Sequence, residues 1–305
     1  MSAANGRKSI FITGAASGIG AETARLFQSR GWFCGLYDID ETGLAEVARE
    51  LGEENCHSAR LDVTKRNDWS AAITGFGEAT SGKMDVLFNN AGIGRHGWFE
   101  DIPPEEADLV IDVNVKGVVN GVYAALPLLK ETENARIVNT ASTAGVVGSP
   151  RLAVYSATKF AVRGLTEALD VELSGLGIRC TSLMPWFIDT PILDMGATEG
   201  SNVKMADEIR DQGQDVYPVS LAAETAWDAA HGKDVHYMAG KRAKQARFAA
   251  RFMPGRMKKQ ILQGLPKRDY AALTADRVDH LTRLNRLKRL RVEVCNGQFS
   301  FNRRV

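Results

Sequence analysis

Short runs of β-branched and aromatic residues alternate with longer helical patterns along the first 184 residues of the chain. The run KSIFIT (8–13) precedes the pattern GAETARLFQSR (20–30), and FCGLYD (33–38) precedes ETGLAEVARELG (41–52). Such alternation predicts βαβ units, in which helices cover both faces of a parallel sheet. Because six strand candidates follow one another with right-handed crossovers, we expect an α/β fold with a doubly wound parallel sheet.

The rest of the chain continues this order. We expect further strands at 55–63, 84–88, 135–140, 178–184 and 234–238, and further helices at 69–77, 104–130, 153–176 and 218–230. Proline and glycine interrupt the weak helical patterns of residues 185–214, so we expect an irregular segment there. A long connection that leaves the carboxyl end of a sheet strand is where a substrate lid lies.

Composition excludes several classes of protein. With 305 residues, 44% of them hydrophobic and 25% charged, the chain has enough apolar surface for a core and is not a disordered, collagen-like or coiled-coil protein. The N-terminal residues do not resemble a signal peptide, and no apolar run approaches the ~20 residues that span a bilayer. The cysteines lack metal-ligand spacing, so we expect no bound metal, a cytoplasmic location and reduced thiols at Cys34, Cys56, Cys180 and Cys295.

Charge divides the chain into two segments. Residues 1–240 carry 20 Lys and Arg against 33 Asp and Glu, a net charge of −13. Residues 241–305 carry 18 against 4, a net charge of +14. We therefore expect a single α/β domain over 1–240 and a helical, basic C-terminal extension over 241–305.

The extension begins with a pattern typical of a basic amphipathic helix that ends at Pro254-Gly255. Such a helix fits an anionic membrane surface or the acidic body of the protein, and we favour docking on that body or on a second subunit. We expect no nucleic-acid partner, because no known binding motif supports one. The predicted apolar face of the helix is Phe248, Ala249, Phe252 and Met253. A later series repeats every three residues and so spreads round a helix instead of forming one stripe: Val278, Leu281, Leu284, Leu287 and Leu290.

A glycine-rich turn, Thr13-Gly14-Ala15-Ala16-Ser17-Gly18-Ile19-Gly20, joins the first strand to the first helix. Glycines at this point let the backbone approach a pyrophosphate at the helix N-terminus. The alternative is an ordinary glycine-rich turn between a strand and a helix. In the context of a βαβ unit we interpret the turn as a dinucleotide-binding site.

Asp38 ends the second strand, 18 residues beyond Gly20. A carboxylate at this position accepts hydrogen bonds from the adenosine ribose hydroxyls and repels a 2′-phosphate. No Lys or Arg occupies positions 15–19 or 36–40 to neutralise such a phosphate, so the sequence favours NAD over NADP. The alternative is a carboxylate that only begins the next helix.

Tyr155 and Lys159 are four residues apart in a helical segment, which places the phenol and the ammonium on one face. A free tyrosine has a pKa of about 10, and a neighbouring cation stabilises the phenolate and lowers that value. The pair is therefore suited to proton transfer. If it stood alone, a surface pair without function would be the default interpretation.

Taken together, these motifs resemble those of the short-chain dehydrogenases/reductases. The resemblance covers about residues 7–195 and consists of five motifs in the family's order and spacing: 13–20, Asn89-Asn90-Ala91-Gly92, Asn114, Ser142, and Tyr155 with Lys159. It implies a Rossmann fold, a nicotinamide cofactor and an oxidoreductase activity.

The resemblance also implies a role for each matching residue. Tyr155 would be the general acid/base, Ser142 would hydrogen-bond the reacting oxygen, and Lys159 would hold the nicotinamide ribose and lower the pKa of the phenol. Asn114 would anchor a water that links Lys159 to solvent. The implied cofactor-binding residues are Gly14, Ser17, Gly18, Ile19, Gly20, Asp38, Ile39, Asp62, Val63, Asn90, Ala91, Gly92, Tyr155, Lys159, Pro185, Ile188 and Thr190.

One position departs from the family pattern. Where the family usually has Pro-Gly after the sixth strand, this chain has Pro185-Trp186. The indole either forms an apolar wall of the substrate pocket, which we favour, or packs under the expected lid as part of the core.

The residues expected to line the substrate pocket are largely apolar: His96, Trp98, Val146, Val147, Trp186 and Phe187. They predict a bulky, hydrophobic secondary alcohol or ketone as substrate, such as a hydroxysteroid or an aryl carbinol. The alternatives are an NADPH-dependent carbonyl reductase, which Asp38 opposes, and a non-catalytic cofactor sensor or scaffold. The helices expected at 104–130 and 153–176 resemble the family's dimerisation helices, which implies a homodimer or homotetramer.

Overall fold

The computed structural model describes residue 4 and residues 6–194, 205–211 and 213–265. The chain divides into two units, Met1–Ile261 and Leu262–Val305, and the fold described below is that of the first unit. The predictions for Cys295 and for the apolar series at 278–290 lie outside the described residues.

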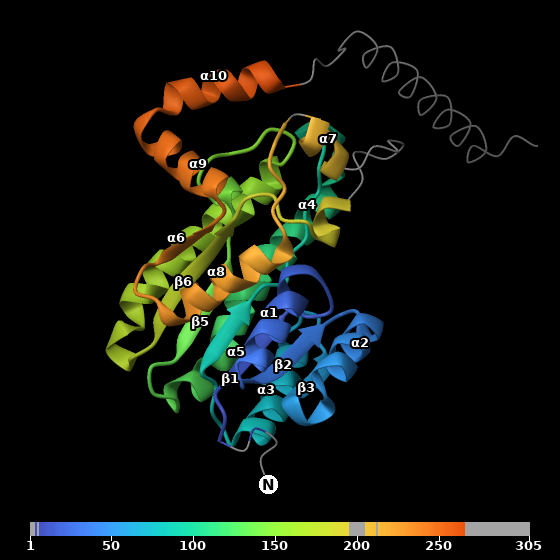
Figure 1. Ribbon diagram of the computed structural model, residues 1–305, viewed down its shortest axis with the longest axis vertical. Coiled ribbons are helices and arrows are strands. Elements are labelled where there is room, and N and C mark those ends of the chain that lie inside the picture. Colours follow the sequence, from blue (N-terminus) through green and yellow to red (C-terminus); the bar gives the residue numbers. More distant parts are fainter. Residues whose placement is uncertain (1–3, 5, 195–204, 212, 266–305) are drawn as a thin grey trace, which may run out of the picture. The chain divides into compact units, whose positions relative to one another are not determined.

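The centre of the first unit is a seven-stranded sheet with all strands parallel, in the order β3-β2-β1-β4-β5-β6-β7 (Figure 1). This confirms the predicted doubly wound fold. The strand order reverses between β1 and β4, and ligands of such sheets bind outside the carboxyl ends of the strands at this point. The strands are β1 (Ser9–Thr13), β2 (Phe33–Asp38), β3 (Cys56–Arg60), β4 (Val86–Asn89), β5 (Arg136–Thr140), β6 (Arg179–Pro185) and β7 (His236–Ala239).

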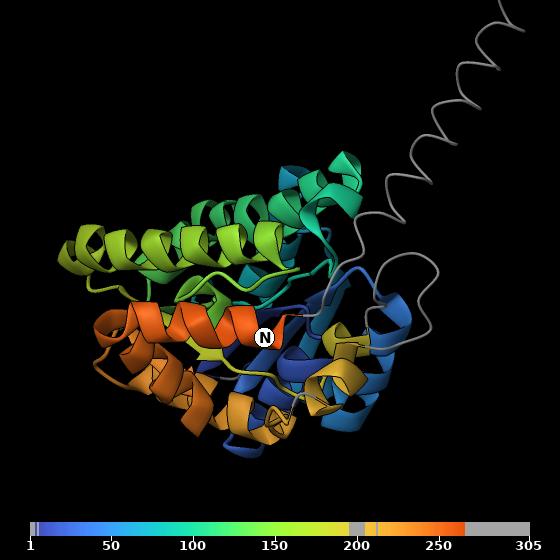
Figure 2. The same ribbon diagram turned by 90° about the horizontal axis from the view of Figure 1, so that it is seen from above.

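Helices cover both faces of the sheet (Figure 2). One core layer packs α1 (Gly18–Ser29), α2 (Glu41–Leu51) and α8 (Val219–His231) against the strands. The other contains α3 (Arg66–Thr80) and α5 (Gly117–Lys130), with α6 (Ala153–Glu172) at its side. All five residues of β1 are buried, as expected for an interior strand of a sheet covered on both faces.

The predicted helix at 104–130 is interrupted by a π-helical turn. It consists of α4 (Pro104–Ile111), the π turn Asp112–Lys116 and α5. Asn114 lies in this turn, and such turns often occur at functional sites. Residues 104–130 are also long and apolar enough to cross a membrane by length and composition alone. Because α5 contributes Val122, Ala125 and Leu129 to the core, burial against the sheet accounts for that composition.

The prediction of an irregular segment at 185–214 is wrong in part. Pro191–Asp194 form a 3-10 turn, and α7 (Met205–Asp211) is a helix. Met205 and Ile209 are four residues apart and pack together with Leu193 in a small separate cluster. Burial of these apolar side chains stabilises a helix that is too short to form alone.

The predicted basic helix is α9 (Lys241–Phe252), which ends before Pro254 and is followed by α10 (Pro254–Gly264). Phe248 and Phe252 of the predicted apolar face lie together, with their ring centres 4.8 Å apart, but they are 58% and 62% exposed, so this face is not the one that docks on the body of the chain. The buried side of α9 is formed instead by Ala243 and Ala246. The small alanine side chains let α9 approach β7 and the short helix Thr143–Gly145 closely. The first helix of the extension is thus part of the compact unit.

Candidate active site

The glycine-rich turn exposes the N-terminus of α1. Gly14 and Gly18 have positive φ angles of 68° and 53°, which L side chains rarely adopt. A Cβ atom on Gly14 would lie 2.9 Å from the Cα of Ala91, so only glycine fits there. Ser17 is the N-cap residue, yet its hydroxyl makes no capping hydrogen bond, and the first turn of α1 carries no acidic side chain. These backbone N–H groups therefore fit the pyrophosphate of a dinucleotide.

Asp38 lies beside this turn, at the carboxyl end of β2. Its Oδ2 accepts a hydrogen bond from the Ala16 N–H (3.1 Å), and its Oδ1 accepts one from the Asp40 N–H (3.1 Å). The next residue, Ile39, is 63% exposed. The carboxylate is thus fixed at the end of the strand, where a ribose hydroxyl of a bound dinucleotide would approach.

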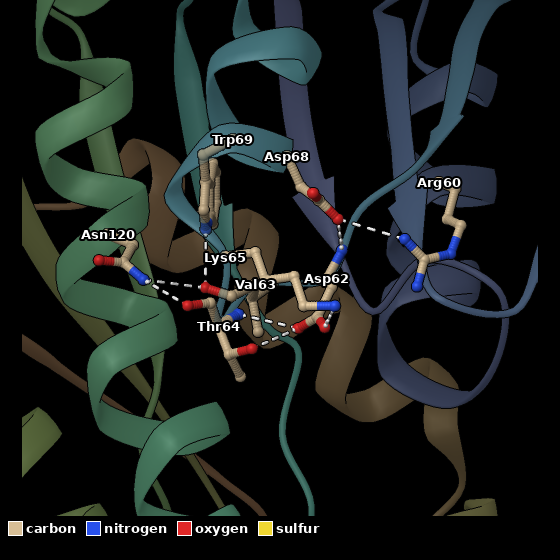
Figure 3. Close-up of polar contacts among 8 residues, drawn as sticks. All are labelled: Arg60, Asp62, Val63, Thr64, Lys65, Asp68, Trp69 and Asn120. Atoms are coloured by element: carbon tan, nitrogen blue, oxygen red, sulfur yellow. Dashed lines mark hydrogen bonds and ion pairs between the residues drawn. The ribbon is translucent and has the colours of Figure 1, made fainter.

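Asp62 is held in the loop between β3 and α3 (Figure 3). Its Oδ1 accepts hydrogen bonds from the Thr64 N–H (3.0 Å) and the Thr64 hydroxyl (2.7 Å), and its Oδ2 lies 3.3 Å from the Lys65 Nζ. Burial opposes ionisation, but these hydrogen bonds and the Lys65 charge outweigh it and lower the pKa of Asp62. The side chain is therefore ionised at neutral pH and fixes the shape of the loop.

Val63 is anchored through its carbonyl oxygen (Figure 3). This oxygen accepts hydrogen bonds from the Trp69 Nε1 (2.9 Å) and the Asn120 Nδ2 (3.1 Å). Sequence reasoning found Asp62 and Val63 but missed Trp69 and Asn120. Asn120 is 57 residues away in the sequence, and only the packing of α5 against this loop reveals its role.

The segment after β4 is tied to the strands on both sides. The Thr13 hydroxyl accepts hydrogen bonds from the N–H groups of Asn90 and Ala91 (both 3.0 Å). The Asn90 Nδ2 donates to the Thr13 carbonyl (3.1 Å), and its Oδ1 accepts from the Thr140 hydroxyl (3.2 Å). β1, β4 and β5 are thereby joined at their carboxyl ends, where a cofactor would lie.

Lys159 and Asn114 converge beside Gly92. A Cβ atom on Gly92 would lie 3.2 Å from the Asn114 Oδ1 and 3.5 Å from the Lys159 Nζ. The Asn114 amide is occupied, since Nδ2 donates to the Ile93 carbonyl (2.8 Å) and the Thr158 hydroxyl (3.1 Å) while Oδ1 accepts from the Ile93 N–H (2.9 Å). The side chain of Asn114 therefore positions the segment after β4, and its role toward a water stays a prediction.

Tyr155 and Lys159 share one face of α6, as their spacing predicts. Lys159 is 3% exposed, and its Nζ donates a hydrogen bond to the Thr140 carbonyl (2.8 Å). The same Nζ lies 5.4 Å from the centre of the half-buried Tyr155 ring. Ser142 precedes the Thr143–Gly145 turn, and its hydroxyl accepts a hydrogen bond from the Ala144 N–H (3.1 Å). The carbonyl of Thr140 is the partner of Lys159 that sequence reasoning missed.

Burial controls the ionisation of both groups. Removal from water lowers the pKa of Lys159 to about 8. Burial raises the pKa of Tyr155, and a hydrogen bond with Ser142 opposes that increase. At neutral pH the side chains are thus a protonated phenol next to an ammonium group, and the ammonium loses its proton as the pH rises through about 8.

The predicted substrate-side residues lie in three loops. His96 and Trp98 are half-buried in a segment whose Gly97 N–H donates to the Arg151 carbonyl (2.8 Å), just before α6. Val146 and Trp186 are half-buried and pack against one cluster, which includes Met184, Met238 and Ala243. Val147 directly follows in the same loop. Phe187 contacts Trp186 edge to face, with the ring centres 5.3 Å apart, and packs against the cluster that contains Leu193 and Met205.

The segment after β6 returns to the glycine-rich turn. The Pro185 carbonyl accepts a hydrogen bond from the Thr143 hydroxyl (3.1 Å), and Ile188 is buried. A Cβ atom on Gly18 would lie 3.3 Å from the Thr190 Cβ, so Thr190 lies beside the N-terminus of α1. The structure therefore brings the predicted residues of β2, β4, β6 and α6 to one edge of the sheet.

Comparison with known proteins agrees with this arrangement. The family model described as short chain dehydrogenase matches residues 8–201, which is more than half of the chain. The chain belongs to this family. The prediction from the sequence motifs is therefore confirmed, and the fold together with the family means that this short chain dehydrogenase is an oxidoreductase that binds a nicotinamide cofactor.

Individual relatives have related descriptions. A 3-alpha-(or 20-beta)-hydroxysteroid dehydrogenase of Mycobacterium bovis is 39% identical over 188 residues, which cover 61% of this chain and 71% of the relative. A short chain dehydrogenase from Burkholderia phymatum in complex with NAD superposes with a TM-score of 0.73 at 29% identity, covering 88% of this chain and 99% of that structure. A 3-ketoacyl-(acyl-carrier-protein) reductase from Brucella melitensis complexed with NADH gives a TM-score of 0.68 at 32% identity, covering 77% and 98%.

Proposed function

We propose that this protein is an NAD-dependent alcohol dehydrogenase that interconverts a bulky, hydrophobic secondary alcohol and its ketone. The observation that carries the proposal is the buried Lys159 ammonium beside the Tyr155 ring and the Thr140 carbonyl. A buried cation is costly unless its charge is used, and here it faces a phenol that must exchange a proton. The Ser142 hydroxyl is hydrogen-bonded to the hydroxyl of Tyr155 and so belongs to the same site.

The proposed mechanism assigns one task to each residue. The nicotinamide, when bound, supplies the hydride acceptor or donor. In the reductive direction Tyr155 donates its proton to the substrate oxygen while Ser142 donates a hydrogen bond to that oxygen. Lys159 stabilises the resulting phenolate by its charge and would hold the nicotinamide ribose. In the oxidative direction the phenolate of Tyr155 accepts the alcohol proton.

The proposed cofactor site consists of the residues at the carboxyl edge of the sheet. The α1 N-terminus would hold the pyrophosphate, and Asp38 would accept hydrogen bonds from the adenosine ribose. A 2′-phosphate would meet the Asp38 carboxylate, which supports NAD over NADP. The Burkholderia phymatum relative was solved with NAD and the Brucella melitensis reductase with NADH, which agrees with this choice.

The proposed substrate class follows from the apolar loops near Ser142. Val146 and Trp186 pack in one cluster, and Trp186 contacts Phe187. Apolar side chains of this size match a hydrophobic substrate. The relative from Mycobacterium bovis is a hydroxysteroid dehydrogenase, which supports a bulky secondary alcohol.

We also propose a homodimer or homotetramer in the cytoplasm. Large apolar side chains are exposed on α5 and α6, with Tyr123 70%, Phe160 42% and Val171 75% exposed, and a helix-to-helix contact with a second subunit would cover them. The described cysteines are unpaired and buried, and burial raises the pKa of Cys34 and Cys180 to about 12. Thiols of this kind suit a reducing compartment.

The direct test is to follow NADH absorbance with purified protein, NAD or NADP, and a panel of steroid, aryl and aliphatic secondary alcohols. The proposal expects turnover with NAD that increases with the apolar size of the alcohol. Turnover with NADP alone, or no turnover across the panel despite NAD binding, would contradict it.

Ketone reduction should depend on pH through Lys159. Since the pKa of Lys159 is about 8 and the ammonium stabilises the phenolate, kcat/KM for ketone reduction should fall above pH ~8, toward tenfold per pH unit. Arginine keeps its charge at any such pH, so Lys159→Arg should be slower but should lack this decrease near pH 8. An unchanged profile in Lys159→Arg would show that another group titrates.

Trp186→Gly should weaken the binding of large substrates. Loss of the indole removes apolar contact, so the KM for a steroid or aryl alcohol should rise about tenfold while the Kd for NAD stays the same. Trp186→Phe, which keeps an apolar ring, should retain most of the affinity. If the indole serves the core alone, Trp186→Gly will lower the melting temperature and leave KM unchanged.

A further inference from the structure

The outward face of α9 combines two exposed aromatic side chains. The rings of Phe248 and Phe252 are one helical turn apart, with their centres 4.8 Å from each other. Because each residue advances about 100° round the helix, they lie about 140° and about 180° from the buried Ala243. The aromatic pair therefore faces away from the core against which α9 packs.

Cations surround this aromatic pair. Lys241, Lys244 and Arg251 are exposed and project from the same half of the helix, and the Arg251 guanidinium lies 5.7 Å from the Phe252 ring centre. Arg242, on another side of the helix, pairs instead with Asp215 at 2.9 Å. No acidic residue occurs between Asp234 and Asp269 in the sequence, so the face has positive charge only.

We propose that the outward face of α9 binds a membrane surface rich in anionic phospholipid. Exposed phenylalanines flanked by Lys and Arg are typical of helices that lie in the headgroup layer, with the rings inserted and the cations among the phosphates. The long Lys and Arg side chains keep their charges at the level of the headgroups. The other candidate partner for this face is the acidic body of a second copy of the chain. Pairing of charges with that body would not explain why two aromatic rings are exposed among the cations.

The position of α9 would bring a bound membrane close to the candidate active site. α9 packs against the Thr143–Gly145 turn, which directly follows Ser142. If the proposed function holds, a hydrophobic alcohol dissolved in the bilayer would be concentrated next to the loops that carry its binding residues. The membrane contact itself does not depend on that function.

The test is sedimentation of the full-length protein with vesicles, without substrate or cofactor. The expected result is binding to vesicles of equal parts phosphatidylglycerol and phosphatidylcholine, much weaker binding to phosphatidylcholine alone, and release by high salt. The double variant Phe248→Ala, Phe252→Ala should lower the partition coefficient about tenfold or more. The triple variant Lys241→Gln, Lys244→Gln, Arg251→Gln should also lower it, by about fivefold for each cation.

Matched variants on other surfaces serve as controls. Phe99→Ala removes an aromatic side chain that is 70% exposed in the short helix Phe99–Asp101, and should leave the partition unchanged. Arg49→Gln, Lys83→Gln and Lys130→Gln together remove three exposed cations elsewhere, and should have a small effect.

Three outcomes would overturn the proposal. They are absence of phosphatidylglycerol-dependent sedimentation, equal binding by the wild type and the α9 variants, or a change of oligomer size in the phenylalanine variant without lipid binding. The last would identify a second copy of the chain as the partner. Sedimentation requires no turnover, so a failure here is distinct from a failure of the proposed dehydrogenase activity.

Discussion

Tyr155→Phe is expected to lower kcat for alcohol oxidation by about 10²- to 10⁴-fold, which is the usual contribution of general acid–base catalysis. The substitution removes only the hydroxyl and keeps the ring that lies 5.4 Å from the Lys159 Nζ. Cofactor affinity should therefore stay within about twofold. The measurement is the initial rate of NADH formation at saturating NAD, together with the Kd for NADH from fluorescence titration.

Tyr123→Phe is the matched control, because it removes the same hydroxyl from a side chain on α5 that is 70% exposed. It should leave kcat unchanged. The melting temperature of Tyr155→Phe should also stay near that of the wild type, so a slower rate would reflect chemistry and not unfolding. If Tyr155→Phe retained more than a tenth of the wild-type kcat, Tyr155 would not be the acid/base.

The features that sequence reasoning found are those encoded by local spacing. Alternation of apolar runs and helical patterns predicts a doubly wound sheet because each element signals its own type over five to twenty residues. The four-residue spacing of Tyr155 and Lys159 places both on one helix face wherever that helix packs. The turn at 13–20 likewise combines its glycines within a single connection.

The contacts that sequence reasoning missed join residues far apart in the chain. Lys159 donates a hydrogen bond to the carbonyl of Thr140, at the end of β5, and Asn120 of α5 donates one to the carbonyl of Val63. Each pair depends on how two elements pack, and no local pattern specifies that. The π turn at Asn114 could not be predicted either, because the sequence of a helix does not reveal where its hydrogen bonds change from the α to the π pattern.

α9 shows a different limit. A hydrophobic pattern selects the most apolar side of a helix as the buried one. In α9 the size of the side chains determines which side is buried. The small Ala243 packs in a cluster with Met184 and Met238, whereas the larger Phe248 lies on the other side and is exposed. The charge pattern of the sequence separated this basic segment from the rest of the chain, but only the packing of α9 showed which of its faces remains exposed.

Asp38→Ser is expected to raise the ratio of kcat/KM for NADP to that for NAD by about 10²-fold or more. The variant removes the charge that repels a 2′-phosphate and also removes charge-assisted hydrogen bonds to the ribose, each worth about 1.5–3 kcal/mol. The carboxylate also accepts from the Ala16 and Asp40 N–H groups, so the free energy of unfolding should fall by about 1–2 kcal/mol. Initial rates with both cofactors and thermal unfolding measure the two effects.

Asp40→Asn provides the control for charge alone. Asp40 is the N-cap of α2, and its side chain accepts hydrogen bonds from the Thr42 and Gly43 N–H groups. Asparagine keeps a capping oxygen while removing one negative charge two residues from Asp38. The cofactor ratio should then change by less than about threefold, because the lost charge does not contact the ribose. Equal changes in both variants would mean that the cofactor preference reflects the general negative potential at this edge of the sheet, and Asp38 would lose its specific role.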